Sequence, residues 1–168
     1  IAEVSAQLPF ENRLVVHTSG SSELSILSDK NRKGVFYPLQ TFSKGKKIDF
    51  AIIPICLEAE NEAAYQLLEK LGNCISQKVV RINSEQRKSL HVAAVYVCNF
   101  VNHLYEIGKE ICEQNNIAFE VLHPLIQETA LKITKLSPRE AQTGPALRND
   151  TKTIEKHLDF LENPTYKK

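Results

Sequence analysis

The stretch from Ser84 to Tyr105 constrains the fold of this chain more than any other part of the sequence. Placed on a helix at about 100° per residue, its apolar side chains cover far more than one side. These residues are Leu90, Ala93, Ala94, Val97, Cys98, Phe100, Val101, Leu104 and, just beyond, Ile107. A helix that is apolar on most faces is typical of a buried position. We therefore expect a long buried helix that begins at a capping box made by Asn83 and Gln86.

A few polar residues interrupt this apolar helix along one narrow line. His91, Asn99 and Asn102 lie on the line, and Glu106 continues it. A buried imidazole or amide costs about 1–3 kcal/mol of stability unless it is hydrogen-bonded. One alternative is structural: His91 bonds a backbone carbonyl, and the two amides bridge to another helix or a second subunit. The other alternative is a binding site, in which a ligand and water satisfy the line.

Length and composition set the class of protein. The 168 residues suffice for one domain or two small parts, and 42% hydrophobic with 24% charged residues is typical of globular proteins. A net charge of +1 argues against nucleic acid as a partner. No apolar run reaches the roughly 18 residues of a membrane span, so we expect a cytoplasmic protein that does not enter a membrane. The chain lacks Met and begins at Ile1, so we expect a portion of a longer protein.

The four cysteines do not form a recognisable metal site. Cys56, Cys74, Cys98 and Cys112 show no CxxC spacing and no pairing with histidine. We expect reduced thiols and no bound metal.

The first half of the chain alternates strands with helical segments. The strands are predicted at Arg13–His17, Gly34–Pro38, Ile52–Glu58 and Lys78–Ile82, and a helix at Glu60–Leu71 is expected to end at Gly72. Leu39 and Phe42 indicate an ordered, partly buried loop after the second strand. This alternation favours an α/β sheet.

The second half contains only helices. After the central helix we expect one from about Phe119 to Lys135, one that starts at Ser137-Pro138 with Glu140 completing a capping box, and one over Thr151–Glu162. The sequence therefore predicts a sheet-bearing domain over residues 1–83 and a helical domain over residues 84–168.

Three stretches place polar residues where packing or turns are expected: Thr18–Ser21, the line on the central helix, and Gln142–Pro145. If they converge, they form a cleft at the domain junction, which is a common place for a ligand. His91 would be the proton donor there. Asn99 and Asn102 would hold a carbonyl or a carboxamide, and Arg148 could pair with a substrate carboxylate.

Each candidate also has a structural interpretation. Thr143-Gly144-Pro145 is then only a sharp turn, Arg148 a surface ion pair, and His17 a structural residue at a strand end. The basic run Lys44–Lys47 is interpreted as a solvated loop. The sequence contains no HExxH motif and no P-loop, and none of its six glycines forms GxGxxG.

Four ordered motifs carry a family resemblance. They are HTSGS at His17–Ser21, GVFYPLQTFS at Gly34–Ser43, the stretch Ser84–Tyr105, and AQTGPALRND at Ala141–Asp150. Together they resemble the NADP-dependent oxidoreductases in which a Rossmann-like domain precedes a helical C-terminal domain of unknown function. Relatives of that family include pyrroline-carboxylate reductases, prephenate dehydrogenases and hydroxyacid dehydrogenases. The resemblance implies that residues 1–83 are the later part of a Rossmann-like α/β domain.

The resemblance also implies an activity, a cofactor and a set of site residues. The activity is hydride transfer between NADP (NADPH) and a small carbonyl or imine substrate. Catalytic roles fall on His91, Asn99 and Asn102; cofactor contacts on Thr18, Ser19, Gly20 and Pro38; and substrate contacts on Gln40, Thr143, Gly144 and Arg148. The helical domain is expected to close the site and form a homodimer. The Gly-rich turn that holds the pyrophosphate in such proteins is not present in this chain.

Two other hypotheses use the same residues. In the first, the chain is a non-catalytic, dimeric module that binds a small molecule or nucleotide and needs no proton donor. In the second, the polar line serves only the packing of subunits.

Overall fold

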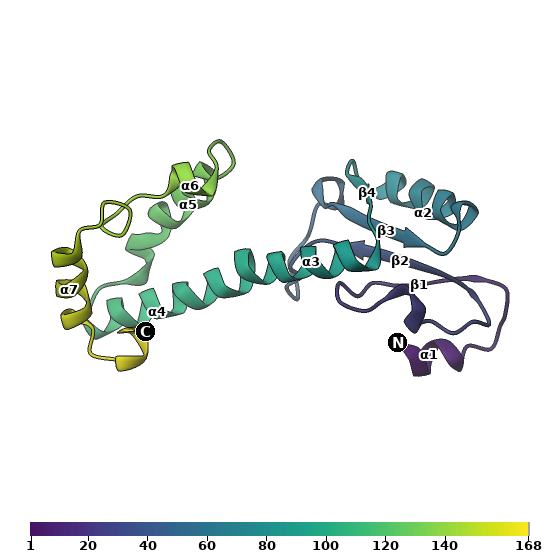
Figure 1. Cartoon of the computed structure of the whole chain (residues 1–168), viewed down its shortest axis with the longest axis horizontal. Helices are drawn as coiled ribbons and strands as arrows, with labels where there is room; N and C mark the ends of the chain where they lie inside the picture. The colour runs from purple at the N-terminus through teal and green to yellow at the C-terminus, as the bar shows by residue number, and fades with distance from the viewer. Residues whose placement is uncertain (168) are drawn as a thin grey trace. The chain divides into compact units, whose positions relative to one another are not determined.

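The computed structural model describes residues 1–167, and these form two compact units, Ile1–Val101 and the described residues from Asn102 onward. The first unit contains the sheet together with the first part of the long helical run (Figure 1). The contacts thus group residues 84–101 with the sheet, whereas the functional boundary at residue 83 stays a prediction.

A four-stranded sheet forms the centre of the first unit (Figure 1). The short helix α1 (Ala2–Ala6) precedes it, and the strands are β1 (Leu14–His17), β2 (Arg32–Pro38), β3 (Ile55–Ala59) and β4 (Val79–Arg81), in that order across the sheet. β1 pairs with β2 in parallel, β2 with β3 antiparallel, and β3 with β4 in parallel. The predicted α/β class is confirmed, and the mixed direction of the strands is a feature that the sequence pattern did not show.

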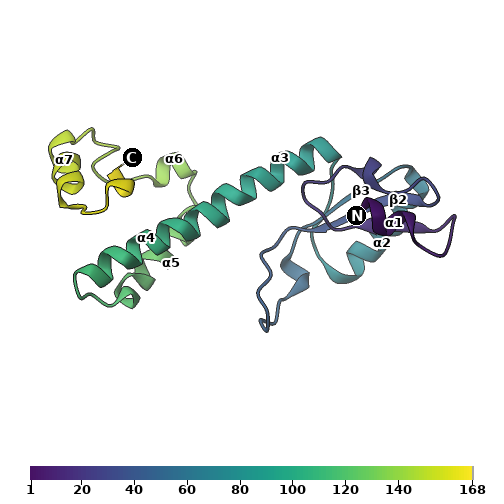
Figure 2. The same cartoon turned by 90° about the horizontal axis from the view of Figure 1, so that it is seen from below.

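The connections explain these directions. β1 reaches β2 through a 3₁₀ turn, η1 (Leu24–Ile26), with enough residues for a parallel crossover. β2 reaches β3 through the loop of residues 39–54, which carries the 3₁₀ turn η2 (Phe50–Ile52) and projects from the strands in Figure 2. In this loop Phe42 is 55% exposed, so the expectation that it is buried is wrong.

Helix α2 (Glu62–Ile75) packs against the sheet and closes the core. Asn61 caps it by accepting a hydrogen bond from the backbone N–H of Ala64. The buried core consists of Ile53, Ile55, Leu57, Tyr65 and Leu68. The prediction that Gly72 ends this helix is wrong, because the helix continues to Ile75. A Cβ at residue 72 would lie 3.0 Å from Val79 Cγ2, so the glycine is there for close packing.

The predicted central helix is a longer run with a change of winding in it. It consists of α3 (Ser84–Ala94), the π-helical segment η3 (Val95–Phe100) and α4 (Val101–Gln114). The capping box of Asn83 and Gln86 is confirmed, with both reciprocal hydrogen bonds present. A π segment widens the turn and is often found near functional sites.

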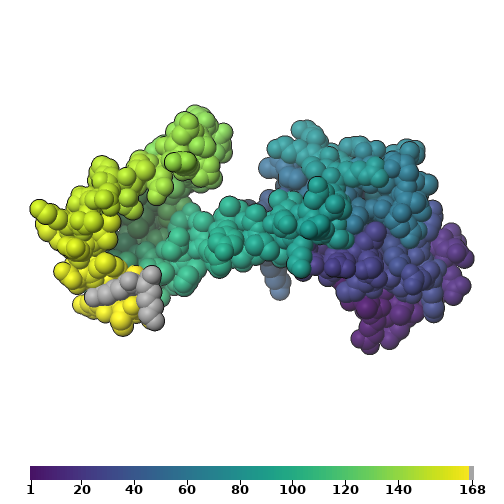
Figure 3. Space-filling view, in the orientation of Figure 1, coloured from purple at the N-terminus to yellow at the C-terminus, as the bar shows by residue number. Residues whose placement is uncertain are grey.

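The prediction that this helix is buried is wrong. Tyr96 is 61% exposed and Val97 is 72% exposed, and the space-filling view shows much of this surface uncovered (Figure 3). Asn99 and Asn102 are exposed as well, so water can satisfy their amides. Burial of these apolar faces would be favourable, but the described residues of this chain do not bury them.

The second unit is entirely helical in its described residues. After α4 it contains η4 (Phe119–Leu122), α5 (His123–Lys132), α6 (Pro138–Ala141), α7 (Thr151–Phe160) and η5 (Pro164–Lys167). The capping box of Ser137 and Glu140 is confirmed, and Asp150 caps α7. The helix predicted from Phe119 to Lys135 is shorter, because a 3₁₀ turn replaces its first residues and it ends at Lys132.

Three further observations concern residues 1–167. None of their helices combines the length and the hydropathy of a membrane-spanning helix. All four cysteines are free, with Cys56 and Cys112 buried and Cys74 and Cys98 exposed. The same residues contain no cluster of three or more side chains able to hold a metal ion.

Candidate functional site

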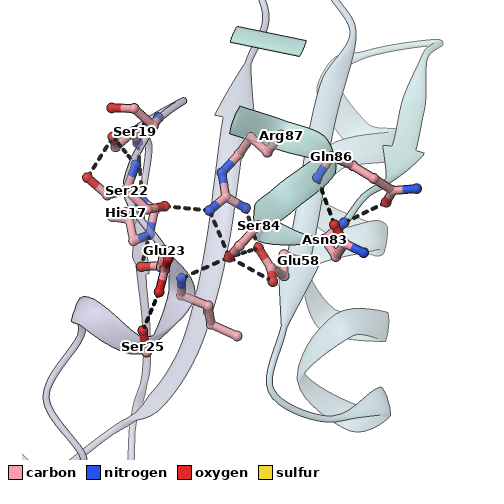
Figure 4. A network of polar contacts seen from close by, with 12 residues as sticks. His17, Ser19, Ser22, Glu23, Ser25, Glu58, Asn83, Ser84, Gln86 and Arg87 are labelled. Atoms are coloured by element: carbon pink, nitrogen blue, oxygen red, sulfur yellow. Dashed lines mark hydrogen bonds and ion pairs between the residues drawn. The ribbon is translucent and has the colours of Figure 1, made fainter. Parts of the chain in front are cut away.

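A buried arginine fixes the start of α3 to the sheet (Figure 4). The side chain of Arg87 is fully buried, and its Nη1 forms an ion pair with Glu58 of β3. Its Nη2 donates to the carbonyl oxygen of Ser22 at 2.5 Å and to Ser84 Oγ at 3.2 Å. The guanidinium thus ties together α3, β3 and the loop that follows β1.

Ser84, at the first position of α3, completes this network. Its hydroxyl lies 3.0 and 2.9 Å from the two carboxylate oxygens of Glu58, and it accepts from the backbone N–H of Leu24 at 3.1 Å. A buried charge is tolerated only when it is paired and hydrogen-bonded. The two Nη atoms of Arg87 meet this requirement through Glu58, Ser84 and Ser22, whereas its buried Nε has no hydrogen-bond partner among the described residues. These contacts fix the direction in which α3 leaves the sheet.

The loop after β1 is held by its own side chains. The backbone N–H of Ser19 donates to His17 Nδ1 at 3.2 Å, which leaves the ring proton on Nε2, 3.3 Å from the carbonyl oxygen of Glu23. Burial is the main cause that lowers the pKa of His17, so the ring is neutral near pH 7. Ser19 Oγ donates to Ser22 Oγ at 2.9 Å. His17 therefore has the structural role that was predicted for it at the end of the strand.

One turn beyond Arg87, His91 meets the first part of this loop at Gly20. Its Nδ1 lies 3.2 Å from the hydroxyl oxygen of Tyr37 in β2, and the two rings are arranged edge to face with centroids 6.3 Å apart. Gly20 lies directly against both rings, since a Cβ there would be 2.5 Å from His91 Nδ1 and 2.9 Å from Tyr37 Cζ. A residue larger than glycine would therefore displace the pair. Three segments distant in sequence thus meet at one imidazole.

The phenol of Tyr37 is a hydrogen-bond donor under ordinary conditions. Burial is the main cause that raises its pKa, so the phenol keeps its proton at neutral pH. If Tyr37 O–H donates to Nδ1 of a neutral His91, the ring proton is on Nε2. This tautomer places a proton donor at the ring nitrogen opposite Tyr37.

A cavity of about 470 Å³ opens beside this pair. Its polar lining residues are Tyr37, Gln40, Thr41, His91 and Asn99, and the others are Leu39, Leu90, Ala93, Ala94, Val95, Val97 and Cys98. A volume in this range suits a small organic molecule. The π segment contributes four of these residues, so the change of winding lies in the wall of the cavity.

The structure places the predicted site residues of the first unit as follows. Gly20, Gln40, His91 and Asn99 lie at or beside the cavity. Pro38 ends β2, next to Tyr37. Thr18 is exposed, whereas Ser19 uses its hydroxyl within the loop. Two of the three stretches expected to converge, the Thr18–Ser21 loop and the central helix, are therefore brought together at His91.

The remaining predicted residues belong to the second unit. Asn102, Thr143 and Arg148 are exposed, and Gly144 has a φ of 101°, a left-handed conformation that favours glycine. The turn that was the structural alternative for residues 143–145 is thus present. Their convergence with His91 stays a prediction.

Sequence reasoning missed Tyr37, Glu58, Ser84 and Arg87. Tyr37 and His91 are 54 positions apart, and no spacing rule links them. A tyrosine within a strand is explained by its preference for sheets alone. Glu58, which follows three buried residues of β3, was the one available signal, since a carboxylate at the end of a buried strand needs a cationic partner.

Comparisons with known proteins identify the family of this chain and solved structures with the same fold. The domain of unknown function DUF2520 matches residues 53–168, so the chain belongs to this family. A crystal structure from Bacteroides fragilis, of the protein BF3122 provisionally described as an NADP oxidoreductase, is 44% identical with a TM-score of 0.85 and covers 91% of this chain. A second, of protein TM1727 from Thermotoga maritima, is 26% identical with a TM-score of 0.79 and covers 94%.

The chain spans only 60% of the first of these proteins and 64% of the second. No protein with curated annotation matches it. The comparisons therefore establish the family and the fold.

Proposed function

We propose that this member of the DUF2520 family is part of an NADP-dependent oxidoreductase that transfers hydride to or from a small carbonyl or imine compound. The observation that carries the proposal is the His91–Tyr37 pair, packed on Gly20 beside a cavity of about 470 Å³. The similarity to a protein provisionally described as an NADP oxidoreductase supports it.

The pair supplies what carbonyl reduction requires of the protein. When hydride adds to the carbon, the oxygen or nitrogen of the substrate takes up a proton, and a positioned side chain can accelerate this transfer about 10²–10⁴-fold. His91 gives the Nε2 proton to the substrate while its Nδ1 takes up the phenolic proton of Tyr37, so the ring stays neutral, and Tyr37 regains a proton from water. In the reverse direction the same transfers run backwards: Nε2 takes the substrate proton, and Nδ1 returns its proton to the Tyr37 oxygen.

The cofactor contacts are proposed for one end of NADP only. Thr18, Gly20 and Pro38 lie on the two chain segments next to His91, where the nicotinamide would supply the hydride. Ser19 acts through the loop, because its hydroxyl is already engaged with Ser22. The residues of this chain do not fit the pyrophosphate, since it contains no GxGxxG turn.

The substrate contacts and the assembly complete the proposal. Asn99 and Gln40, both at the cavity, would orient the carbonyl group, and Asn102, Thr143, Gly144 and Arg148 would contribute from the second unit. The exposed apolar surface around Tyr96 and Val97 supports a homodimer. Kinship with pyrroline-carboxylate reductases and prephenate dehydrogenases, and a cytoplasmic location, belong to the same proposal.

The test is an NADPH titration followed by nicotinamide fluorescence, together with an assay of NADPH oxidation against a panel of ketones and imines. Both are made on the longest natural form of the protein and on this chain of 168 residues. Saturable binding with turnover in the longer form supports the proposal. Binding without turnover of any substrate favours the non-catalytic module, and no binding to either folded protein rejects NADP as the cofactor.

A further inference from the structure

The cavity beside His91 is built mainly from aliphatic side chains. Leu90, Ala93 and Ala94 come from α3, Val95 and Val97 from η3, and Leu39 from the loop after β2. Tyr37 and His91 stand together in its lining. A molecule in the cavity would therefore meet a hydrogen-bonding pair at one point and apolar walls around it.

Within residues 1–167, the lining of this cavity includes no Asp, Glu, Lys or Arg. The nearest buried charges, Arg87 and Glu58, neutralise one another, and Arg87 is fully buried. Lys46 and Lys47 line a separate, adjoining cavity of about 220 Å³, in which Asp49 also takes part. The cavity beside His91 thus offers hydrogen bonds but no fixed charge to a ligand.

This absence of charge determines what the cavity can hold. A carboxylate moved from water into an apolar site loses its hydration, and the loss is recovered only if a cation or several donors replace it. An uncharged carbonyl needs a single donor, which His91 can provide, while its apolar group gains from leaving water. The walls therefore discriminate between compounds of the same shape that differ in charge.

We infer that the part of the substrate bound against His91 and Tyr37 is uncharged and apolar, a ketone or neutral imine carrying an aryl or alkyl group and no carboxylate. This inference rests on the proposed function and names its substrate class. It concerns only this part of the substrate, and the proposed contact of Arg148 with a carboxylate applies to another part.

The test compares acetophenone with benzoate, which have nearly the same shape and differ in charge. Each is titrated into the ¹⁵N-labelled chain at pH 8.0, and the dissociation constant is taken from shifts of the amide signals of residues 90–99. Fragments of this size bind in about the millimolar range. Acetophenone is expected to bind at least about tenfold more tightly. Equal or tighter binding of benzoate overturns the inference.

Two variants at one position keep the test independent of folding defects. Thr41→Lys adds a cation to the lining and is expected to raise the affinity for benzoate at least about tenfold, whereas Thr41→Gln adds similar length without charge and should leave it unchanged. The double variant Lys46→Ala/Lys47→Ala should not alter either affinity. If it weakens benzoate binding to the wild-type site, the adjoining lysines serve this cavity and the inference is wrong.

Nicotinamide and nicotinate provide the last arm, since they share one ring and differ in charge. The inference expects nicotinamide to compete with acetophenone for the cavity, whereas nicotinate should compete at least about tenfold more weakly. Equal competition by nicotinate would overturn the inference. These binding measurements need no turnover and therefore test the inference separately from the proposed function. If the protein prefers acetophenone but reduces no substrate, the oxidoreductase proposal is rejected and the charge preference of the cavity still holds.

Discussion

The two ends of the helical run from Ser84 to Phe100 belong to one unit but differ in which side chains are buried and which are exposed. At the first end, polar side chains are buried: Arg87 and Ser84 bond Glu58 and the loop after β1. At the other end, apolar side chains such as Tyr96 and Val97 are exposed. His91 lies between the two, at the point where the anchored turns give way to the exposed ones.

This contrast shows that the polar residues, and not the apolar ones, determine how the helix is attached in this chain. An apolar surface can pack in many orientations, whereas a guanidinium shared by a carboxylate, a hydroxyl and a carbonyl allows few. The anchor thereby sets the position of His91 relative to Tyr37 and Gly20. The exposed end remains available for contacts outside the described residues.

Breaking the anchor is expected to give the largest loss of stability. Arg87→Ala leaves Glu58 without its cation and should lower the free energy of unfolding of the first unit by about 3–5 kcal/mol, measured by urea denaturation. Val97→Ala, at the exposed end, should change it by at most about 0.5 kcal/mol. Arg81→Ala is the matched control, because Arg81 pairs with Glu62 on the surface, and about 1 kcal/mol is expected. Equal losses of unfolding free energy for Arg87→Ala and Arg81→Ala would contradict the claim that the buried polar contacts attach the helix to the sheet.

The next effect in size is expected at the contact between the loop and the helix. Gly20→Ala forces His91 or Tyr37 to move, and overpacking of this kind costs about 1–3 kcal/mol. Gly108→Ala in α4 is the matched control with the opposite sign, because nothing lies within 4 Å of a Cβ there. It should stabilise its unit by about 0.5–1 kcal/mol. If Gly20→Ala is neutral in thermal denaturation and in the NMR signals of His91, the close contact does not hold.

Removing the phenol oxygen should have a smaller effect on stability and a clear effect on the imidazole. Tyr37→Phe loses one hydrogen bond, worth about 0.5–1.5 kcal/mol. The ¹⁵N spectrum of the ring should show His91 mainly in the form with hydrogen on Nε2 in the wild type and a mixture of tautomers in the variant. An unchanged tautomer in Tyr37→Phe would mean that Tyr37 does not determine it, and a wild-type ring with its hydrogen on Nδ1 would mean that Tyr37 accepts the hydrogen bond.

The smallest effect is a pH dependence from His17. Burial lowers its folded-state pKa below the unfolded value of about 6.5, so the unfolded chain binds more protons as the pH falls. The contribution of His17 to stability is therefore complete above about pH 6.5 and is lost as the pH falls towards the lowered folded-state pKa. The difference in urea midpoint between pH 7.5 and pH 5.5 should shrink in His17→Gln. An equal or larger difference in that variant would assign the pH dependence to other groups.

Much of the fold could be predicted because its signals are local. The four strands, the caps at Asn83 and Ser137 and the α/β class depend on short stretches of sequence, and the structure confirms them, although β3 begins at Ile55 and not at the predicted Ile52. The end of α2 was mispredicted because Gly72 is read locally as a stop, although its reason is contact with Val79. The antiparallel pairing of β2 with β3 follows from the path of a long loop, which periodicity does not encode.

The site was predictable in part for the same reason. His91 stands out as a polar residue in an apolar helix, and the structure places it at the cavity. Tyr37 and Arg87 do not stand out, because their partners lie 54 and 29 positions away and each residue type is ordinary in its own element. The wrong prediction that the helix is buried has a related cause. The apolar pattern shows which faces of a helix are stabilised by burial, but it does not identify the segment or partner that buries them.

The most direct test of the central claim is the turnover number of His91→Gln in the longest natural form of the protein, with NADPH and a ketone that the wild type reduces. The account predicts a fall in kcat of about 100-fold or more, with the Kd for NADPH unchanged, because the proton donor is lost. His157→Gln, which alters an exposed histidine of α7, should leave kcat unchanged. A His91→Gln variant with a kcat within about twofold of the wild type would contradict the account and remove His91 from the mechanism.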